Sequence, residues 1–131
     1  MIVDTSAWVE YLRGTGSPVH LRLRHAVESG APLATPAPVL MELLAGCVTE
    51  ESATAIQRLL ARFELLPVEG LADFEDAAFI QRLCRRGGET ARSMIDCLIA
   101  AMALREGRPL LARDRDFAAI ARCVDLELVD V

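Results

Sequence analysis

The chain contains no lysine and no asparagine, and its 14 basic side chains are all arginine. The absence of lysine excludes every enzyme mechanism in which a lysine acts as nucleophile or as general base. Histidine is scarce as well, because the chain has only His20 and His25. We expect both on one helix near the N-terminus, in surface or partner-facing positions without a catalytic role.

Cysteine is present, but not in a pattern typical of a structural zinc site. The four residues form no CxxC pair and have no histidine near them: Cys47, Cys84, Cys97 and Cys123. We expect free thiols in a reducing cytosol and regard a zinc site or a disulfide as the less favoured alternatives.

Long hydrophobic runs are also absent. The longest nearly apolar stretch, from Met94 to Leu104, is too short to cross a bilayer and contains Asp96. The N-terminus, MIVDTS, has no basic region and no apolar segment of the kind that a signal peptide needs. These features predict a cytoplasmic protein without membrane contact. The apolar fraction of 53% then indicates an apolar surface that a partner covers.

Net charge and length further limit the classes of protein to which this chain can belong. A net charge of −5 argues against bulk electrostatic attachment to nucleic acid, although carboxylates could gather in one pocket. With 131 residues, a single domain over residues 1–131 is expected, with enough chain to bury a core.

Short apolar segments alternate with amphipathic ones along the whole chain. We predict strands at 1–4, 33–35, 64–68, 110–112 and 126–129, and helices at 6–13, 18–30, 38–47, 50–63, 71–86, 92–106 and 116–122. This alternation predicts an α/β fold, with a short, mostly parallel sheet covered by helices on both faces. Ligands of such folds bind beyond the carboxyl ends of the strands. That rule places Asp4 and Asp114 at the functional edge.

Five carboxylates occupy informative positions: Asp4, Glu42, Asp96, Asp114 and Asp116. Asp4 and Asp114 each follow an apolar strand, and Asp116 completes a DxD pair. Glu42 and Asp96 interrupt apolar helices, where a charge is costly unless it is paired or bound to a metal.

Each of these acids also has a simpler interpretation. Asp4, Asp114 and Asp116 could be caps or turn residues at helix starts, Asp96 could stabilise a first helical turn, and Glu42 could face solvent. Caps do not require all five acids to converge on one sheet edge, however. Clustered carboxylates repel one another unless a cation lies among them, and ligands made only of oxygen suit Mg²⁺ or Mn²⁺.

Four segments together resemble the PIN-domain family of ribonucleases, and in particular the short VapC toxins of VapBC toxin–antitoxin pairs. They are MIVDTSAWVEYL (1–12), MELLAG (41–46), RSMIDCLIAAMA (92–103) and LLARDRDF (110–117). The resemblance implies a three-layer α/β/α domain that binds Mg²⁺ or Mn²⁺ and cleaves RNA. It also implies a VapB-type antitoxin as partner, in a homodimer or a hetero-oligomer with the antitoxin.

The resemblance also assigns roles to residues. Asp4, Glu42, Asp96 and Asp114 would be the catalytic acids. The metal ligands would be Asp4, Asp96, Asp114 and Asp116. Thr5, Ser6, Asp116 and Arg92 would be auxiliary residues. One departure is Ala112, where many relatives have serine or threonine, so a supporting hydrogen bond is expected to be missing there, whereas no metal ligand is lost.

Arginines flank these motifs on two sides: Arg82, Arg85, Arg86 and Arg92 on one, Arg113 and Arg115 on the other. Guanidinium groups suit bidentate contacts with phosphate, but solvated helix ends and ion pairs explain them equally well. Trp8 and Tyr11 could stack on bases, although a core or interface position is favoured.

Two other functions fit part of this pattern. Phosphoryl-transfer proteins with aspartates at strand ends, such as response regulators and haloacid dehalogenases, rely on a lysine that this chain lacks. A non-catalytic PIN-like module that binds a partner is the alternative from a different class. The complete acidic set argues against it, because a scaffold has no reason to keep clustered like charges.

Overall fold

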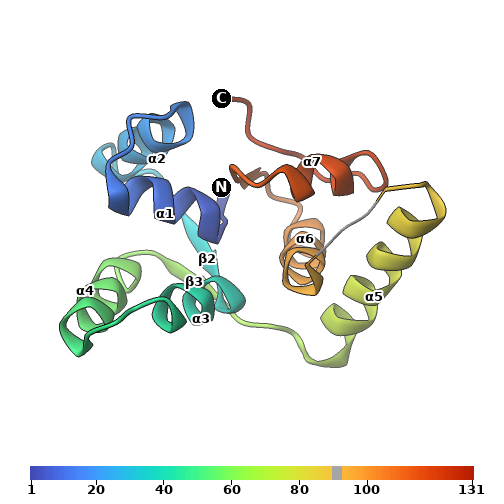
Figure 1. The fold of residues 1–131 in the computed structure, drawn as a ribbon, viewed down its shortest axis with the longest axis horizontal. Coiled ribbons are helices and arrows are strands. Elements are labelled where there is room, and N and C mark those ends of the chain that lie inside the picture. Colours follow the sequence, from blue (N-terminus) through green and yellow to red (C-terminus); the bar gives the residue numbers. More distant parts are fainter. Residues whose placement is uncertain (90–92) are drawn as a thin grey trace.

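The computed structural model describes residues 1–89 and 93–131, and in this part of the chain a sheet of four parallel strands forms the centre of the molecule (Figure 1). The strands are β1 (Ile2–Val3), β2 (Ala34–Pro36), β3 (Glu64–Leu66) and β4 (Leu110–Leu111), in the order β3-β2-β1-β4. The chain moves outward from β1 to β3 and then returns to β4. The direction of winding therefore reverses between β1 and β4, which is where ligands of open α/β sheets bind.

Helices cover both faces of this sheet. They are α1 (Thr5–Arg13), α2 (Pro18–Glu28), α3 (Ala37–Ala45), α4 (Glu50–Leu60), α5 (Gly70–Arg86), α6 (Met94–Glu106) and α7 (Arg115–Ala121). Right-handed crossovers between parallel strands put the connections β1–β2 and β2–β3 on one face and the connection β3–β4 on the other. Figure 1 accordingly shows α1–α4 on one side and α5 and α6 on the other. The predicted α/β/α fold is confirmed.

Local capping explains where several helices begin and end. In five helices a side-chain oxygen of the N-cap residue accepts a hydrogen bond from a backbone N–H of the first turn. These N-cap residues are Asp4, Ser17, Thr49, Ser93 and Asp114. Gly14 and Gly107 end α1 and α6 in the left-handed conformation, with φ of 60° and 62°. Because Asp4 and Asp114 follow β1 and β4, both acids start a helix at the same edge of the sheet.

The core lies on both sides of the sheet and includes the single tryptophan. Trp8 is fully buried, and its ring centroid lies 5.7 Å from that of Tyr11 and 5.8 Å from that of Phe63. The prediction that Trp8 belongs to the core is confirmed, and its ring is not available to stack on a base.

Two predicted elements need correction. The strand at 126–129 is reduced to a parallel bridge between Leu128 and Leu110. Among the described residues of other elements, only Leu110 exchanges backbone hydrogen bonds with this segment, as donor to Glu127 and acceptor from Val129. The helix expected at 92–106 begins at Met94, after its N-cap Ser93. Arg92 lies outside the described residues.

The prediction for the histidines was half wrong. His25 is exposed, as expected, but His20 is buried with 8% of its surface accessible. Its Nδ1 accepts a hydrogen bond from the backbone N–H of Gly16 at 2.8 Å, and its ring packs against Tyr11. His20 therefore helps to fix the turn between α1 and α2, and both histidines lie on α2.

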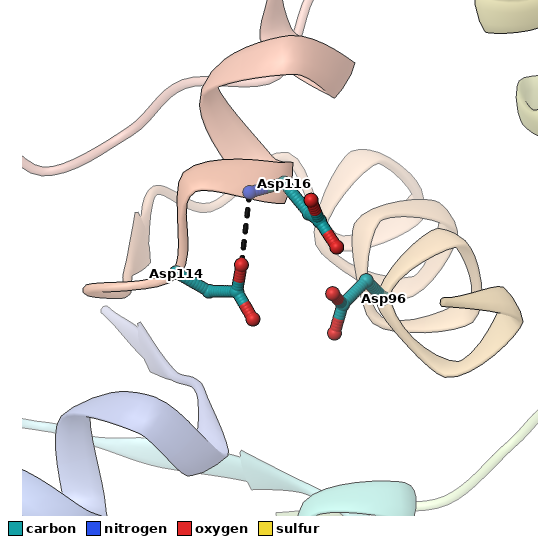
Figure 2. Close-up of side chains that lie close together, drawn as sticks. All are labelled: Asp96, Asp114 and Asp116. Carbon is teal, nitrogen blue, oxygen red and sulfur yellow. Dashed lines mark hydrogen bonds between the residues drawn. The ribbon is translucent and has the colours of Figure 1, made fainter. Parts of the chain in front are cut away.

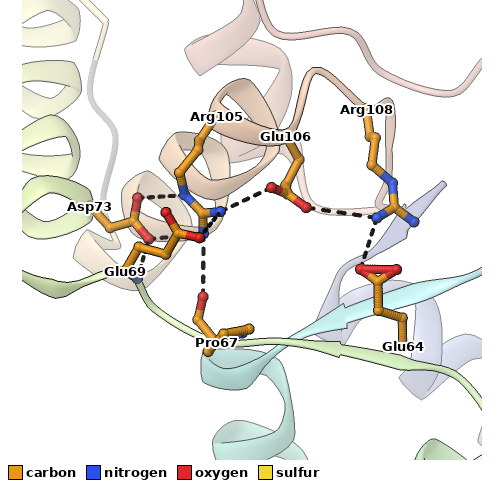
Figure 3. Close-up of polar contacts among 7 residues, drawn as sticks. All are labelled: Glu64, Pro67, Glu69, Asp73, Arg105, Glu106 and Arg108. Atoms are coloured by element: carbon orange, nitrogen blue, oxygen red, sulfur yellow. Dashed lines mark hydrogen bonds and ion pairs between the residues drawn. The ribbon is translucent and has the colours of Figure 1, made fainter.

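A buried ion pair joins α5 to α6 (Figure 3). Asp73 is fully buried, and its two carboxylate oxygens accept hydrogen bonds of 3.0 Å from Nε and Nη2 of Arg105. The backbone N–H of Glu69 donates a third bond at 2.8 Å, and Arg105 also donates to the carbonyl of Pro67. These contacts fasten the segment between β3 and α5 to the helix that carries Asp96.

None of the helices in the described residues is both long and apolar enough to cross a membrane.

Candidate metal centre

Three carboxylates meet beyond the carboxyl ends of β1 and β4 (Figure 2). Asp96, Asp114 and Asp116 each offer one oxygen atom, and these atoms lie within 4.8 Å of one another. Asp96 comes from the first turn of α6, whereas the other two come from the start of α7. We call this group the aspartate cluster. It contains only oxygen donors, which are the donors that Mg²⁺ and Mn²⁺ prefer.

Asp96 is the most strongly perturbed member of the aspartate cluster. Its backbone N–H donates to Oγ of the N-cap Ser93 at 3.2 Å, and only 7% of its surface is accessible. Burial raises the pKa of Asp96 to about 8, and the negative charges of Asp4, Asp114, Asp116 and Glu42 add to this rise. The electrostatic free energy at this position would therefore be lowered by a bound cation.

The other two members are held by the backbone of the loop between β4 and α7. Oδ1 of Asp114 accepts a hydrogen bond from the backbone N–H of Asp116 at 2.9 Å. This bond places the two carboxylates next to each other and leaves both side chains partly open to solvent. The loop itself is fixed by Ser6, whose Oγ accepts the backbone N–H groups of Arg113 and Asp114 at 2.9 and 3.3 Å.

Asp4 lies beside the aspartate cluster and has an oxygen without a partner. Its Oδ2 accepts bonds from the backbone N–H and from Oγ of Ser6 at 2.9 and 2.6 Å. Its Oδ1 is buried and has no hydrogen-bond partner among the described residues. Burial raises the pKa of Asp4, with a smaller contribution from Glu42, and the bonds from Ser6 oppose part of this rise. An orphaned buried oxygen of this kind fits a cation ligand.

Glu42 approaches from α3 and is oriented by the first helix. The hydroxyl of Thr5 donates to Oε1 of Glu42 at 2.7 Å, across 37 residues of sequence. Glu42 is half-buried, so part of the residue is accessible to solvent.

The sequence-predicted residues thus divide into three groups. Asp96, Asp114 and Asp116 lie together, so the structure places Asp116 in the same group of possible metal ligands as Asp114. Asp4 and Glu42 lie outside this set of three, close enough to raise the pKa of Asp96. Thr5 and Ser6 each hold one of these two acids. Arg92 lies outside the described residues.

Sequence reasoning missed one charged residue beside this site. Glu10 is buried on α1 with 4% of its surface accessible, and its carboxylate pairs with the guanidinium of Arg113. Arg113 is therefore held at both ends, by Ser6 through its backbone and by Glu10 through its side chain. A signal was present, because Glu10 follows Ser6 by four residues and so lies on the same side of a helix.

Comparison with known proteins supports a family assignment. The family model described as PIN domain matches residues 1–122. A VapC ribonuclease of Mycobacterium bovis and ribonuclease VapC11 of Mycobacterium tuberculosis are each 44% identical over 128 residues, which cover 97% of this chain and 96% of theirs.

Solved structures share the fold. VapBC2 from Rickettsia felis, solved with a DNA fragment from its promoter, superimposes with a TM-score of 0.77 at 18% identity, covering 99% of this chain and 97% of the other. VapC20 of Mycobacterium tuberculosis, described as a toxin that cleaves the sarcin–ricin loop, has a TM-score of 0.66 at 26% identity and covers 95% and 97%. The chain belongs to the PIN-domain family and, within it, to the VapC ribonucleases.

Proposed function

We propose that this protein is a metal-dependent endoribonuclease toxin that hydrolyses phosphodiester bonds in RNA and is restrained by a VapB-type antitoxin. The observation that carries this proposal is the aspartate cluster, with three carboxylates within 4.8 Å and the pKa of Asp96 raised to about 8. Such crowding of carboxylates destabilises the folded protein, and the ribonuclease function of the family explains why the carboxylates lie together.

The acids fit one or two divalent cations. Asp96, Asp114 and Asp116 would hold Mg²⁺ or Mn²⁺, with the unpartnered Oδ1 of Asp4 as a further ligand atom. When bound, such an ion activates water and stabilises the negative charge that develops on the phosphate. No cysteine belongs to the aspartate cluster and both histidines lie on α2, so the donor set favours these ions over zinc.

The neighbouring residues have distinct tasks. Ser6 fixes one oxygen of Asp4 and the loop that carries Asp114, so that the acids that follow the neighbouring strands β1 and β4 keep their spacing. Thr5 binds one oxygen of Glu42. In this proposal the other oxygen of Glu42 accepts a proton from the attacking water, so that Glu42 is the general base.

Apolar side chains that are exposed on α1, on α3 and just after α3 support an antitoxin partner. Leu12 on α1, Met41 on α3 and Val48 after α3 are 46%, 55% and 98% exposed. We expect an amphipathic segment of the antitoxin to cover this region, between α1 and the helices α3 and α4.

The direct test is RNA cleavage by the purified protein. Total bacterial RNA is expected to be cut with Mg²⁺ or Mn²⁺ present and to stay intact in excess EDTA. Expression of the chain alone is expected to arrest bacterial growth, whereas expression of Asp114→Asn is not. Efficient cleavage by metal-free protein contradicts the metal dependence. A folded protein that cuts no RNA with either ion indicates the alternative, a non-catalytic partner-binding module.

The chemistry of the cut ends gives a second prediction. Attack by water leaves a 5′-phosphate and a 3′-hydroxyl, whereas attack by the neighbouring 2′-hydroxyl, commonly assisted by histidine, leaves a 2′,3′-cyclic phosphate. His20 is buried against Tyr11, and no histidine belongs to the aspartate cluster. We therefore expect 5′-phosphates in ligation-based end mapping. A substrate with a 2′-methoxy group at the cut should still be cleaved, and cyclic-phosphate ends would show that the mechanism is wrong.

A further inference from the structure

Three arginines share a hollow on the surface of α5. Arg82, Arg85 and Arg86 are all exposed, and together they line a cavity of about 390 Å³. The buried residues Ile80 and Cys84 face the core from the other side of the same turns. We call this feature the arginine hollow.

The charges of the arginine hollow are not neutralised by carboxylates. In residues 1–89 and 93–131, no ion pair within 4.0 Å involves any of the three arginines. The nearby acid Glu89 is occupied, because both of its oxygens accept bonds from Arg122 at 2.6 and 2.8 Å. Arg82 instead lies over the ring of Phe79, at 5.8 Å from its centroid.

This arrangement favours a ligand with several negative charges. Like charges three and four residues apart on a helix repel one another, and the pairs 82/85 and 82/86 have these spacings. The dipole at the end of α5 stabilises cations but does not require three of them around one cavity. The chain has 19 acidic side chains against 14 arginines, so three unpaired arginines in one place contrast with the net charge of −5.

The helix that carries the arginine hollow packs against the helix that carries Asp96. Gln81, which precedes Arg82, packs against α6 with its Oε1 3.4 Å from Sγ of Cys97. Cys97 is the residue next to Asp96, and Arg85 lies four residues, about 6 Å along the helix axis, beyond Gln81. A polymer that passes over the carboxylates and on along α5 would meet these guanidinium groups.

We propose that the arginine hollow binds backbone phosphates of the RNA strand on one side of the bond that is cut. This inference rests on the proposed ribonuclease function. The aspartate cluster repels phosphate, so a strand can lie there only if cations nearby hold it. Arg113, on the opposite side, is already paired with Glu10. Guanidinium groups bind phosphate oxygens in a bidentate manner, without regard to base sequence.

A charge-matched pair of triple variants tests the proposal. The first carries Arg82→Gln, Arg85→Gln and Arg86→Gln. The control carries Arg22→Gln, Arg24→Gln and Arg58→Gln, three exposed positions on α2 and α4. Binding of a fluorescein-labelled 20-residue polyuridylate is measured in EDTA between 50 and 300 mM NaCl, beside an equally long labelled polyglutamate. Cleavage of total bacterial RNA in Mg²⁺ is followed in parallel, with circular dichroism as the check on folding.

The first variant is expected to bind polyuridylate about tenfold more weakly at 100 mM NaCl. The slope of the logarithm of its association constant against the logarithm of the salt concentration should become less negative by about 2, because three phosphate contacts to a single strand are lost. KM for RNA cleavage should rise while kcat stays within about twofold. Equal losses in both variants, or a loss for polyglutamate alone, would overturn the proposal. If wild type binds polyuridylate through this hollow but cuts no RNA, the ribonuclease function fails and the phosphate site stands.

Discussion

Asp96→Asn is expected to abolish RNA cleavage and, in the metal-free protein, to raise the free energy of unfolding at pH 8. Cleavage should fall about a thousandfold or more, the size of effect seen when a charge-stabilising group is removed from an active centre. The substitution removes a carboxylate that is buried among the charges of Asp4, Asp114, Asp116 and Glu42. Urea unfolding in EDTA and cleavage of total RNA measure the two effects.

The sign of the stability effect follows from the pKa of Asp96. Its pKa is raised from 3.8 to about 8 in the folded protein, so between these pH values the folded state binds more protons than the unfolded state. The contribution of Asp96 to stability is therefore complete below pH 3.8 and is lost as the pH rises through 8. Asp96→Asn cannot titrate, so its stability advantage over wild type should grow from pH 5 to pH 8.

Asp76→Asn is the matched control, because Asp76 is exposed on α5 and the change in charge is the same. It should follow wild type in both stability and cleavage. Added Mg²⁺ should stabilise wild type and stabilise Asp96→Asn much less, because binding to the folded state adds to its stability. An Asp96→Asn protein that is less stable than wild type at pH 8, or that still cuts RNA, argues against a crowded metal centre.

The edge of the sheet that carries the site could be predicted from the sequence. Strands that alternate with helices form a parallel sheet, and the carboxyl ends of its strands share one edge. Asp4 and Asp114 follow apolar strands, so this rule placed both correctly without any knowledge of the strand order. Asp96 could be recognised because a charge in an apolar helix needs a partner.

The choice between cap and site residue could not be made from the sequence, and the structure shows that the two are compatible. A carboxylate has two oxygens. Oδ2 of Asp4 accepts the bonds that start α1, while its Oδ1 is left without a partner. Asp114 caps α7 and belongs to the aspartate cluster at the same time.

Contacts between distant segments were beyond sequence reasoning. Glu10 and Arg113 pair across 103 residues because β1 lies next to β4, and no local pattern gives the order of strands. Asp114 and Asp116 both belong to the aspartate cluster because of the conformation of one loop, which no local sequence pattern specifies. The strand at 126–129 was predicted from its apolar residues, but β4 is too short to pair with a full strand there.

Asp73→Asn is expected to lower the free energy of unfolding by about 3–5 kcal/mol at pH 7, the usual cost of removing one partner from a buried ion pair. The side chain of Arg105 is 21% exposed, and its guanidinium would lose its bidentate partner between α5 and α6. Urea unfolding monitored by circular dichroism measures the loss. Glu69→Gln removes a second, 61% exposed partner of Arg105 and should cost less than about 1 kcal/mol.

The pH dependence separates the ion pair from a packing effect. Burial alone would raise the pKa of Asp73, but the hydrogen bonds from Arg105 and from the backbone of Glu69, with the charge of Arg105, hold that pKa below its usual value. The stability that this pair contributes is therefore present above the unfolded pKa of 3.8 and is lost as the pH falls through the lower folded pKa. Protonated Asp73 resembles asparagine, so the difference between wild type and Asp73→Asn should shrink in acid. A difference that is small at pH 7, or that persists unchanged in acid, would mean that the charge of Asp73 does not hold α5 to α6.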